Sequence, residues 1–389
     1  MSRTRRDVLC LSATLGVTGL AGCSTVDRDG GYTSSDPRET ERPVTGEFVP
    51  ELLAFDEAVL SFMNDHEIPG GVLGVARDGD VVLERGYGYR DESMTEPMAT
   101  DTLVRVASLS KVFTRAAVRK LLRETPALSI EDAAFALLDV DPLPGETSND
   151  DLAAVTIGHL LGHQGGWDRT QVPDPVFSQL DIALEQDWEQ PPDERRLVRY
   201  MLSEPLQFEP GTKRVYSNIG YVVLGQLIEA VTGRPYQEYL TDVLLAPHDI
   251  TDVALGRSLP SDRPTDESWY FDERACRNVV EVNPMELVRC PDGGFHLEAT
   301  AASGGQVVTV RDFLRFMKHY WLGGTPRTSD HQTWLFNGTL PGTFSKAIQT
   351  GGVDIVVVFN RRGYSPSYLE RGIRDQLLGA LDSIEQWPG

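Results

Sequence analysis

Apolar residues recur along the chain at spacings that predict strands near both ends and helices between them. Residues 52–63 repeat with a helical spacing, which predicts an amphipathic opening helix. Residues 72–76 and 81–85 are rich in β-forming side chains and flank an Asp-Gly pair at 78–79. Because Asp-Gly between two such runs favours a tight turn, these residues predict a β-hairpin.

The remaining pattern is helical until strands return near the end of the chain. Helices are predicted over residues 108–123, 219–231 and 368–385, and strands over residues 343–349 and 353–359. Strands at both ends with helices between them predict an α+β fold. We expect an antiparallel sheet formed from both termini and flanked by helices, with an inserted lobe that is mainly helical.

The first 23 residues have the pattern of an export signal. Paired arginines at positions 5 and 6 precede an apolar stretch, as in a twin-arginine signal. The stretch ends in Leu-Ala-Gly-Cys, which resembles a lipobox and predicts lipidation of Cys23. An uncleaved anchor over residues 8–26 is the alternative, and its Gly, Ser and Thr content disfavours it. We expect an exported protein, lipid-anchored on the outer face of the cell membrane or extracellular.

Composition divides the rest of the chain into two segments and limits the classes of partner that it can bind. Residues 24–46 are polar and predict a flexible tether, which leaves 47–389 as one catalytic domain. The net charge of −22 repels polyanions and excludes a nucleic-acid partner. This charge indicates either adaptation to high salt or an ordinary acidic surface. We expect a monomer that binds a small-molecule or peptide substrate and meets a membrane only through its N-terminal lipid or anchor.

Cysteine and histidine spacing gives no metal site. Cys276 and Cys290 lie in the folded part and either form a disulfide or remain free thiols. The chain has no CxxC pair, and His159 and His163 lack the glutamate of an HExxH motif. We therefore expect neither a metal nor an organic cofactor.

Ser108 and Lys111 are the first candidate catalytic residues. They are three residues apart at the start of a predicted helix, so the amine can approach the hydroxyl on one helix face. A helix N-terminus also favours an alkoxide and the oxyanion of an acyl intermediate. Taken alone, the pair is better explained by a helix-capping serine and a solvated lysine.

Tyr216 and Asn218 form a second candidate motif. They precede the helix predicted over 219–231. The tyrosine could pass a proton between the serine and a leaving group, while the asparagine could bind substrate or Lys111. An ordinary loop tyrosine and a helix-capping asparagine are the alternative for an isolated match.

The order of these motifs resembles the β-lactamase-related serine hydrolases. That family includes class C β-lactamases, D-alanyl-D-alanine carboxypeptidases and β-lactamase-like esterases. The matching stretches are 76–79, 85–89, 106–111, 155–163, 208–211, 216–221, 303–305 and 309–313. The resemblance implies that Ser108 is the acylated nucleophile, that Lys111 is its general base, and that Tyr216 and Asn218 form the second motif.

A third motif departs from the family pattern. Phe336 occupies the position of a Lys or His that in β-lactamases and peptidases orients the substrate carboxylate. Gly338 still permits close backbone approach, and the resemblance implies that the Thr339 N–H pairs with that of Ser108 as an oxyanion hole. His331 is a minor candidate for the absent cation.

These residues predict a serine hydrolase that cleaves an ester or amide through a Ser108 acyl-enzyme. Phe336 disfavours a true β-lactamase, and an aromatic residue there, as in some related esterases, favours ester hydrolysis. The alternative is a non-catalytic, penicillin-binding-like surface protein that binds ligand without turnover because the third cation is absent.

Overall fold

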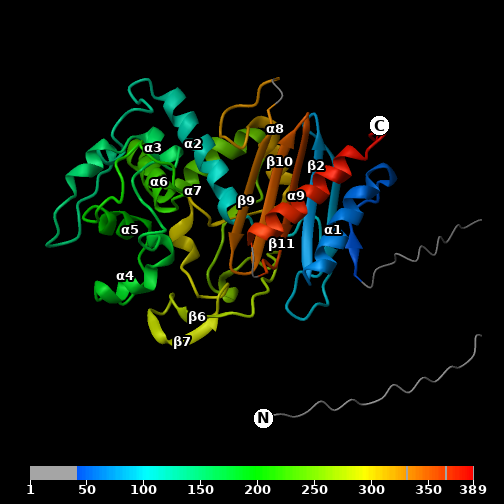
Figure 1. Cartoon of the computed structure of the whole chain (residues 1–389), viewed down its shortest axis with the longest axis horizontal. Coiled ribbons are helices and arrows are strands. Elements are labelled where there is room, and N and C mark those ends of the chain that lie inside the picture. The colour runs from blue at the N-terminus through cyan, green and yellow to red at the C-terminus, as the bar shows by residue number, and fades with distance from the viewer. Residues whose placement is uncertain (1–41, 330–331, 364–365, 389) are drawn as a thin grey trace, which may run out of the picture. The chain divides into compact units, whose positions relative to one another are not determined.

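The computed structural model describes residues 42–329, 332–363 and 366–388, which lie in one compact unit (Figure 1). The expected signal, Cys23, most of the expected tether and His331 lie outside the described residues. Val44 and Thr45, at the end of that expected tether, form strand β1 and pair with Tyr87 and Gly86. Among the described residues, no helix is both long and apolar enough to cross a membrane.

A six-stranded antiparallel sheet is built from the two ends of this unit. Its order is β1-β3-β2-β11-β10-β9, so a strand from each end of the chain meets at the centre. The strands are β1 (Val44–Thr45), β2 (Gly70–Arg77), β3 (Asp80–Gly88), β9 (Trp334–Leu340), β10 (Thr343–Thr350) and β11 (Val353–Phe359). This arrangement confirms the predicted α+β fold.

Helices cover both faces of the sheet, which explains the continuous apolar run of β11. Ile355 and Val357 face the cluster formed with α1 (Leu53–Asp65) and α9 (Pro366–Asp382). Val356 and Val358 face the opposite cluster, which includes α2 (Ser110–Glu124) and α8 (Val310–His319). Figure 1 shows α1 and α9 together on one face. Since successive side chains of a strand point to opposite faces, a strand covered on both sides is apolar throughout.

A helical lobe lies beyond the β9 edge of the sheet (Figure 1). Its core helix α6 (Ile219–Thr232) ends at Gly233, which adopts the left-handed conformation with φ +67° that suits glycine at this position. The other helices of the lobe are α3 (Ile157–Leu161), α4 (Gln179–Glu185), α5 (Glu194–Met201) and α7 (Tyr236–Glu238). The insertion of this lobe between the two halves of the sheet confirms the predicted organisation.

Two small sheets complete the fold. One has the order β4-β8-β5 and the other is the β6–β7 hairpin. Their strands are β4 (Val104–Arg105), β5 (Val253–Leu255), β6 (Ala275–Asn278), β7 (Asn283–Arg289) and β8 (Gln306–Val308). Cys276 and Cys290 form a disulfide with Cα atoms 4.9 Å apart, which decides between the two states that the sequence leaves open.

Candidate active site

Ser108 lies in a strained turn just before α2. The turn is a short 3-10 helix (Ala107–Leu109), and Ala107 has a φ of +50°, which non-glycine residues rarely adopt. Ser110 holds the turn because its Oγ donates to the Ala107 carbonyl at 2.7 Å. Ser345 Oγ of β10 donates to the Val106 carbonyl at 2.8 Å. The strain is thus supported from both sides, and it leaves Ser108 half-buried at the surface of a cleft.

Lys111 is fully buried beneath Ser108. Its Nζ lies 3.3 Å from Ser108 Oγ and 2.8 Å from Asn218 Oδ1, and it also contacts the Ser303 carbonyl. Burial holds the pKa of Lys111 well below its usual range, and the charges of Arg115 and Arg169 lower it further.

The Asp174 carboxylate opposes the downward pKa shift of Lys111 and also fixes the orientation of the Asn218 side chain. Its charge raises the pKa of Lys111, although burial outweighs it. Its Oδ2 accepts hydrogen bonds from the Asn218 backbone N–H at 3.1 Å and from Nδ2 at 2.8 Å. Because Nδ2 points at the carboxylate, Oδ1 of the same amide is turned toward Lys111.

Tyr216 contacts Ser108 from the other side. Its hydroxyl donates to Ser108 Oγ at 2.7 Å. Burial raises the pKa of Tyr216, so this residue stays a neutral phenol at neutral pH. Its ring stacks on His163 with centroids 4.5 Å apart, and the Arg169 guanidinium lies 5.0 Å above it.

His163 has a structural role in this arrangement. Its Nδ1 accepts a hydrogen bond from the Ser217 N–H at 3.3 Å, which holds the loop that carries Tyr216. Burial is the main cause that lowers the pKa of His163 to about 3, so the ring is neutral. His159 instead bonds the Thr156 backbone N–H at 3.3 Å in a capping box. No group of three potential metal ligands occurs in the described part of the chain.

Strand β9 can lie directly beside Ser108 because residue 338 is a glycine. A Cβ at Gly338 would lie 2.2 Å from the Val106 carbonyl oxygen and 2.8 Å from the Ser108 nitrogen. Thr339 follows on this edge strand and lines the same cleft as Ser108. The oxyanion-hole role of the Ser108 and Thr339 N–H groups stays a prediction.

The cleft has a volume of about 680 Å³ and includes Phe336, as the third motif predicts. The Arg115 guanidinium lies 4.8 Å over the Phe336 ring. Its Nε donates to Tyr221 Oη at 2.6 Å, and Nη1 donates to the Leu322 carbonyl at 3.3 Å. A cation therefore lies against Phe336, but it comes from α2 and is engaged by other groups.

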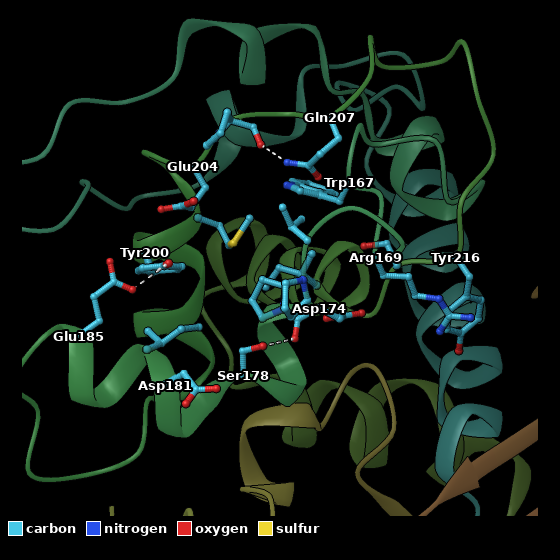
Figure 2. A pocket seen from close by; sticks show the side chains of 18 residues that line it. Trp167, Arg169, Asp174, Ser178, Asp181, Glu185, Tyr200, Glu204, Gln207 and Tyr216 are labelled. Atoms are coloured by element: carbon cyan, nitrogen blue, oxygen red, sulfur yellow. Dashed lines mark hydrogen bonds between the residues drawn. The ribbon is translucent and has the colours of Figure 1, made fainter. Parts of the chain in front are cut away.

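A second pocket of about 310 Å³ shares Tyr216 and Arg169 with the cleft (Figure 2). Figure 2 shows these two side chains on one side of the pocket, with Glu185 and Glu204 on the other. Burial and the charge of Glu185 raise the pKa of Glu204. The remaining walls are largely apolar and include Trp167, Pro175, Ile182, Met201 and Ile219.

The structure brings four of the predicted site residues together, namely Ser108, Lys111, Tyr216 and Asn218. Asp174 and Arg115 also contact this site, and they were not predicted. Arg115 follows Lys111 by four residues, one helical turn, and that spacing could have indicated its proximity. Asp174 lies 44 residues before Asn218 and carries no local signal.

Comparison with known proteins identifies the family. Residues 55–361 match the family described as Beta-lactamase. The chain belongs to the beta-lactamase family. This match confirms the resemblance to the β-lactamase-related hydrolases that the sequence motifs indicate.

Two curated relatives and one solved structure illustrate the similarity. A penicillin-binding protein of Bacillus subtilis is 31% identical over 259 residues, which are 64% of this chain and 52% of that protein. The D-aminopeptidase of Cereibacter sphaeroides is 30% identical over 201 residues, 51% of this chain and 35% of that enzyme. The chain thus spans about half or less of the length of these relatives. A β-lactamase/D-alanine carboxypeptidase from Pseudomonas syringae shares the fold, with a TM-score of 0.62, 16% identity, and coverage of 87% of this chain and 100% of that one.

Proposed function

We propose that this hydrolase is an exported serine enzyme that cleaves esters, or less readily amides, through an acyl-enzyme on Ser108. The observation that supports it most is the pair of contacts at Ser108 Oγ. Lys111 Nζ lies 3.3 Å away on one side and Tyr216 Oη 2.7 Å away on the other. A nucleophile between a base and a proton donor is the arrangement that acyl transfer requires.

The hydrogen-bond inventory of Lys111 supports the role of a base. A neutral amine has two N–H groups and one lone pair. The Asn218 Oδ1 and the Ser303 carbonyl can accept the two N–H groups, which leaves the lone pair for the Ser108 hydroxyl. The depressed pKa of Lys111 favours this neutral form. Tyr216, with its raised pKa, is a donor to Ser108 Oγ and not a competing base.

The reaction then follows in two halves. Ser108 Oγ attacks the substrate carbonyl carbon as its proton passes to Lys111, and the N–H groups of Ser108 and Thr339 stabilise the oxyanion. The tetrahedral intermediate expels the leaving group, which receives a proton from Tyr216 as Tyr216 takes up the proton that Lys111 had accepted. In the second half, water attacks the acyl carbonyl and gives a proton to Lys111, which returns this proton to the Ser108 oxygen as the acid product leaves.

Phe336 supports ester over β-lactam or peptide substrates. Its phenyl ring supplies no cation on β9, and the N–H groups of Arg115 behind it are partly used by Tyr221 and Leu322. An ester also expels an alkoxide or phenoxide, a better leaving group than an amide nitrogen. The D-aminopeptidase relative keeps amides as the second substrate class.

A serine-directed fluorophosphonate probe tests the mechanism. We expect the native protein to be labelled and Ser108→Ala to be unlabelled, with Ser61→Ala, an exposed serine of α1, labelled as the native protein is. Hydrolysis of 4-nitrophenyl acetate should fall about a thousandfold in Ser108→Ala. Absence of labelling in the native protein, or equal labelling of Ser108→Ala, would refute the proposal.

The non-catalytic alternative gives a different result. A binding protein would retain ligand without releasing nitrophenol from any activated ester. In that case Phe336→His should restore turnover of carboxylate-bearing substrates if the absent cation is the defect.

Export is part of the proposal. The Cys276–Cys290 disulfide supports it, because such bonds persist in oxidising compartments outside the cytoplasm. We propose that Cys23 carries the lipid. Cys23→Ser should abolish incorporation of labelled palmitate and move the protein from the membrane fraction to the medium. Unchanged incorporation in this variant would contradict lipidation at Cys23.

A further inference from the structure

The cleft around Ser108 is rich in cations although the chain is strongly acidic. Arg169, Arg214 and Arg362 line it together with Ser108. No Asp or Glu is among the described residues that line this cleft. A chain with 58 acidic and 36 basic residues would supply more acids than bases to an average surface. The cleft therefore has the opposite charge from the molecule that contains it.

These three arginines lack a directly bonded carboxylate among the described residues, although the charge of Asp272 acts on Arg362 and only partly offsets the burial that lowers its pKa. Within the residues that the structure describes, none of them forms an ion pair with an Asp or Glu. Arg169 and Arg214 are exposed, and Arg169 rests over the Tyr216 ring. The Nε of Arg362 is buried and has no hydrogen-bond partner. Leaving a buried polar group unpaired is unfavourable, and a bound anion would supply the partner.

Asp174, the carboxylate bound to Asn218, is directed away from the cleft. Asp174 binds the Asn218 amide and backbone, and it lines the neighbouring pocket shown in Figure 2 but not the cleft. The carboxylates Glu185 and Glu204 also belong to that pocket. Their negative charges lie on its far side from Arg169 and Tyr216 (Figure 2). The positive charge of the cleft is thus available to a ligand.

The arginines reach the cleft from separate segments. Arg169 and Arg214 come from loops of the helical lobe, and Arg362 follows the sheet strand β11. Guanidinium groups bind carboxylates through paired, charge-assisted hydrogen bonds. These segments provide the positive charge that β9 lacks at Phe336.

We propose that Arg169, Arg214 and Arg362 are specificity residues that select esters carrying a carboxylate in addition to the scissile bond. This inference rests on the proposed ester hydrolysis, since it names the substrate class of the same site. It also assigns recognition of the anion to loops of the helical lobe and to the segment that follows β11. In this respect these segments replace β9, the strand that carries the third motif.

Matched esters test the charge preference. Mono-4-nitrophenyl adipate, 4-nitrophenyl hexanoate and 4-nitrophenyl 6-aminohexanoate share a leaving group and a six-carbon acyl chain, but carry negative, zero and positive charge. We expect kcat/KM to be about tenfold higher for the adipate than for the hexanoate, and lowest for the cationic ester. The preference should shrink as NaCl is raised from about 0.05 to 1 M, because salt screens exposed charges.

The adipate and the hexanoate form the first anionic and neutral pair. A second pair places the charge on the leaving group. Here 4-acetoxybenzoate is compared with its methyl ester. A preference for the anion in either pair supports the proposal, and the pair in which it occurs locates the anion relative to the scissile bond. Equal kcat/KM within both pairs overturns it.

Variants then assign the preference to the arginines. Arg169→Ala, Arg214→Ala and Arg362→Ala should each lower the anionic-to-neutral ratio of kcat/KM by about three- to tenfold, with the largest effect at the half-buried Arg362. Arg362→Lys should retain part of the ratio. Arg371→Ala removes an equal charge from the exposed surface of α9 and should leave the ratio unchanged. A ratio that none of the three cleft variants alters overturns the assignment.

Failure of the underlying hydrolysis is distinguishable from failure of this inference. If the native protein turns over no ester, equilibrium dialysis of radiolabelled adipate against the native protein and the three variants still measures anion binding. Binding lost in the cleft variants supports the arginine site, and binding that is absent or unchanged by them refutes it.

Discussion

Substituting Gly338 by alanine tests whether activity depends on the close approach of β9 to the 3-10 turn that contains Ser108. The new Cβ would lie 2.2 Å from the Val106 carbonyl oxygen, 2.5 Å from Ser345 Oγ and 2.8 Å from the Ser108 nitrogen. Two of these three neighbours are backbone atoms that cannot rotate away. Since carbon and oxygen atoms pack at about 3.3 Å, the strand must retreat by roughly 1 Å from the turn.

This retreat should affect rate more than folding. A displacement of about 1 Å in a catalytic group costs on the order of 100-fold in rate, while overpacking costs about 1–3 kcal/mol of unfolding free energy. We therefore expect Gly338→Ala to lower kcat/KM for 4-nitrophenyl acetate by about 100-fold and to leave a folded protein with a reduced Tm. The decrease should be in kcat, because an oxyanion forms only in the transition state.

Gly379→Ala is the matched control. This glycine lies in α9, and a Cβ added to it would have no neighbouring atom within 4 Å, so the methyl group meets open space. Alanine should stabilise the helix by up to about 1 kcal/mol and leave kcat/KM unchanged. If Gly338→Ala stays within threefold of the native kcat/KM at an unchanged Tm, β9 does not shape the oxyanion site and the reasoning is wrong.

Three further predictions follow from the geometry. The pKa of Lys111 is depressed, so kcat/KM should rise with pH and reach a plateau below pH 10.5, the ordinary pKa of lysine. The free energy of unfolding should decrease as pH falls from 10.5 to the pKa of Lys111 in the folded protein, with a slope of about 1.4 kcal/mol per pH unit. Urea titrations of Lys111→Met should lack this slope. Asp174→Asn removes two charge-assisted bonds to Asn218 and a charge that raises the Lys111 pKa, so kcat/KM should fall about tenfold and the pH–rate curve should move to lower pH. Cys276→Ser should lower the urea-unfolding free energy by about 3 kcal/mol, since the disulfide to Cys290 spans 14 residues, and dithiothreitol should reproduce this loss in the native protein.

Several elements could be predicted because their signals are local. The β2–β3 hairpin follows from Asp78 and Gly79, which adopt φ values of +52° and +86° in the turn. The end of α6 follows from Gly233. The predicted strands at 72–76 and 81–85 are shorter than β2 and β3, because pairing continues along the sheet to Gly70 and Gly88 beyond the apolar run.

The start of α2 differs from its prediction. A helix was expected from residue 108, but α2 begins at Ser110 and Ser108 lies in the preceding 3-10 turn. The strain at Ala107 explains the difference, since this residue packs in a cluster with Phe295, Leu297 and Leu340, which are distant in sequence. Local propensity contains no information about such contacts.

The amino-acid sequence by itself determined the family, the α+β fold, and the order of the motifs that contain Ser108, Lys111 and Tyr216. These properties depend on spacing along one chain, and spacing is visible in the sequence. Only the tertiary structure decided the charge and solvation of the site. Lys111 is buried, Asp174 is bound to Asn218, and three arginines that form no ion pair within the described residues converge on the cleft, because the fold brings separate segments together. Desolvation and Coulomb interactions depend on distances in space, which the linear order of residues does not contain.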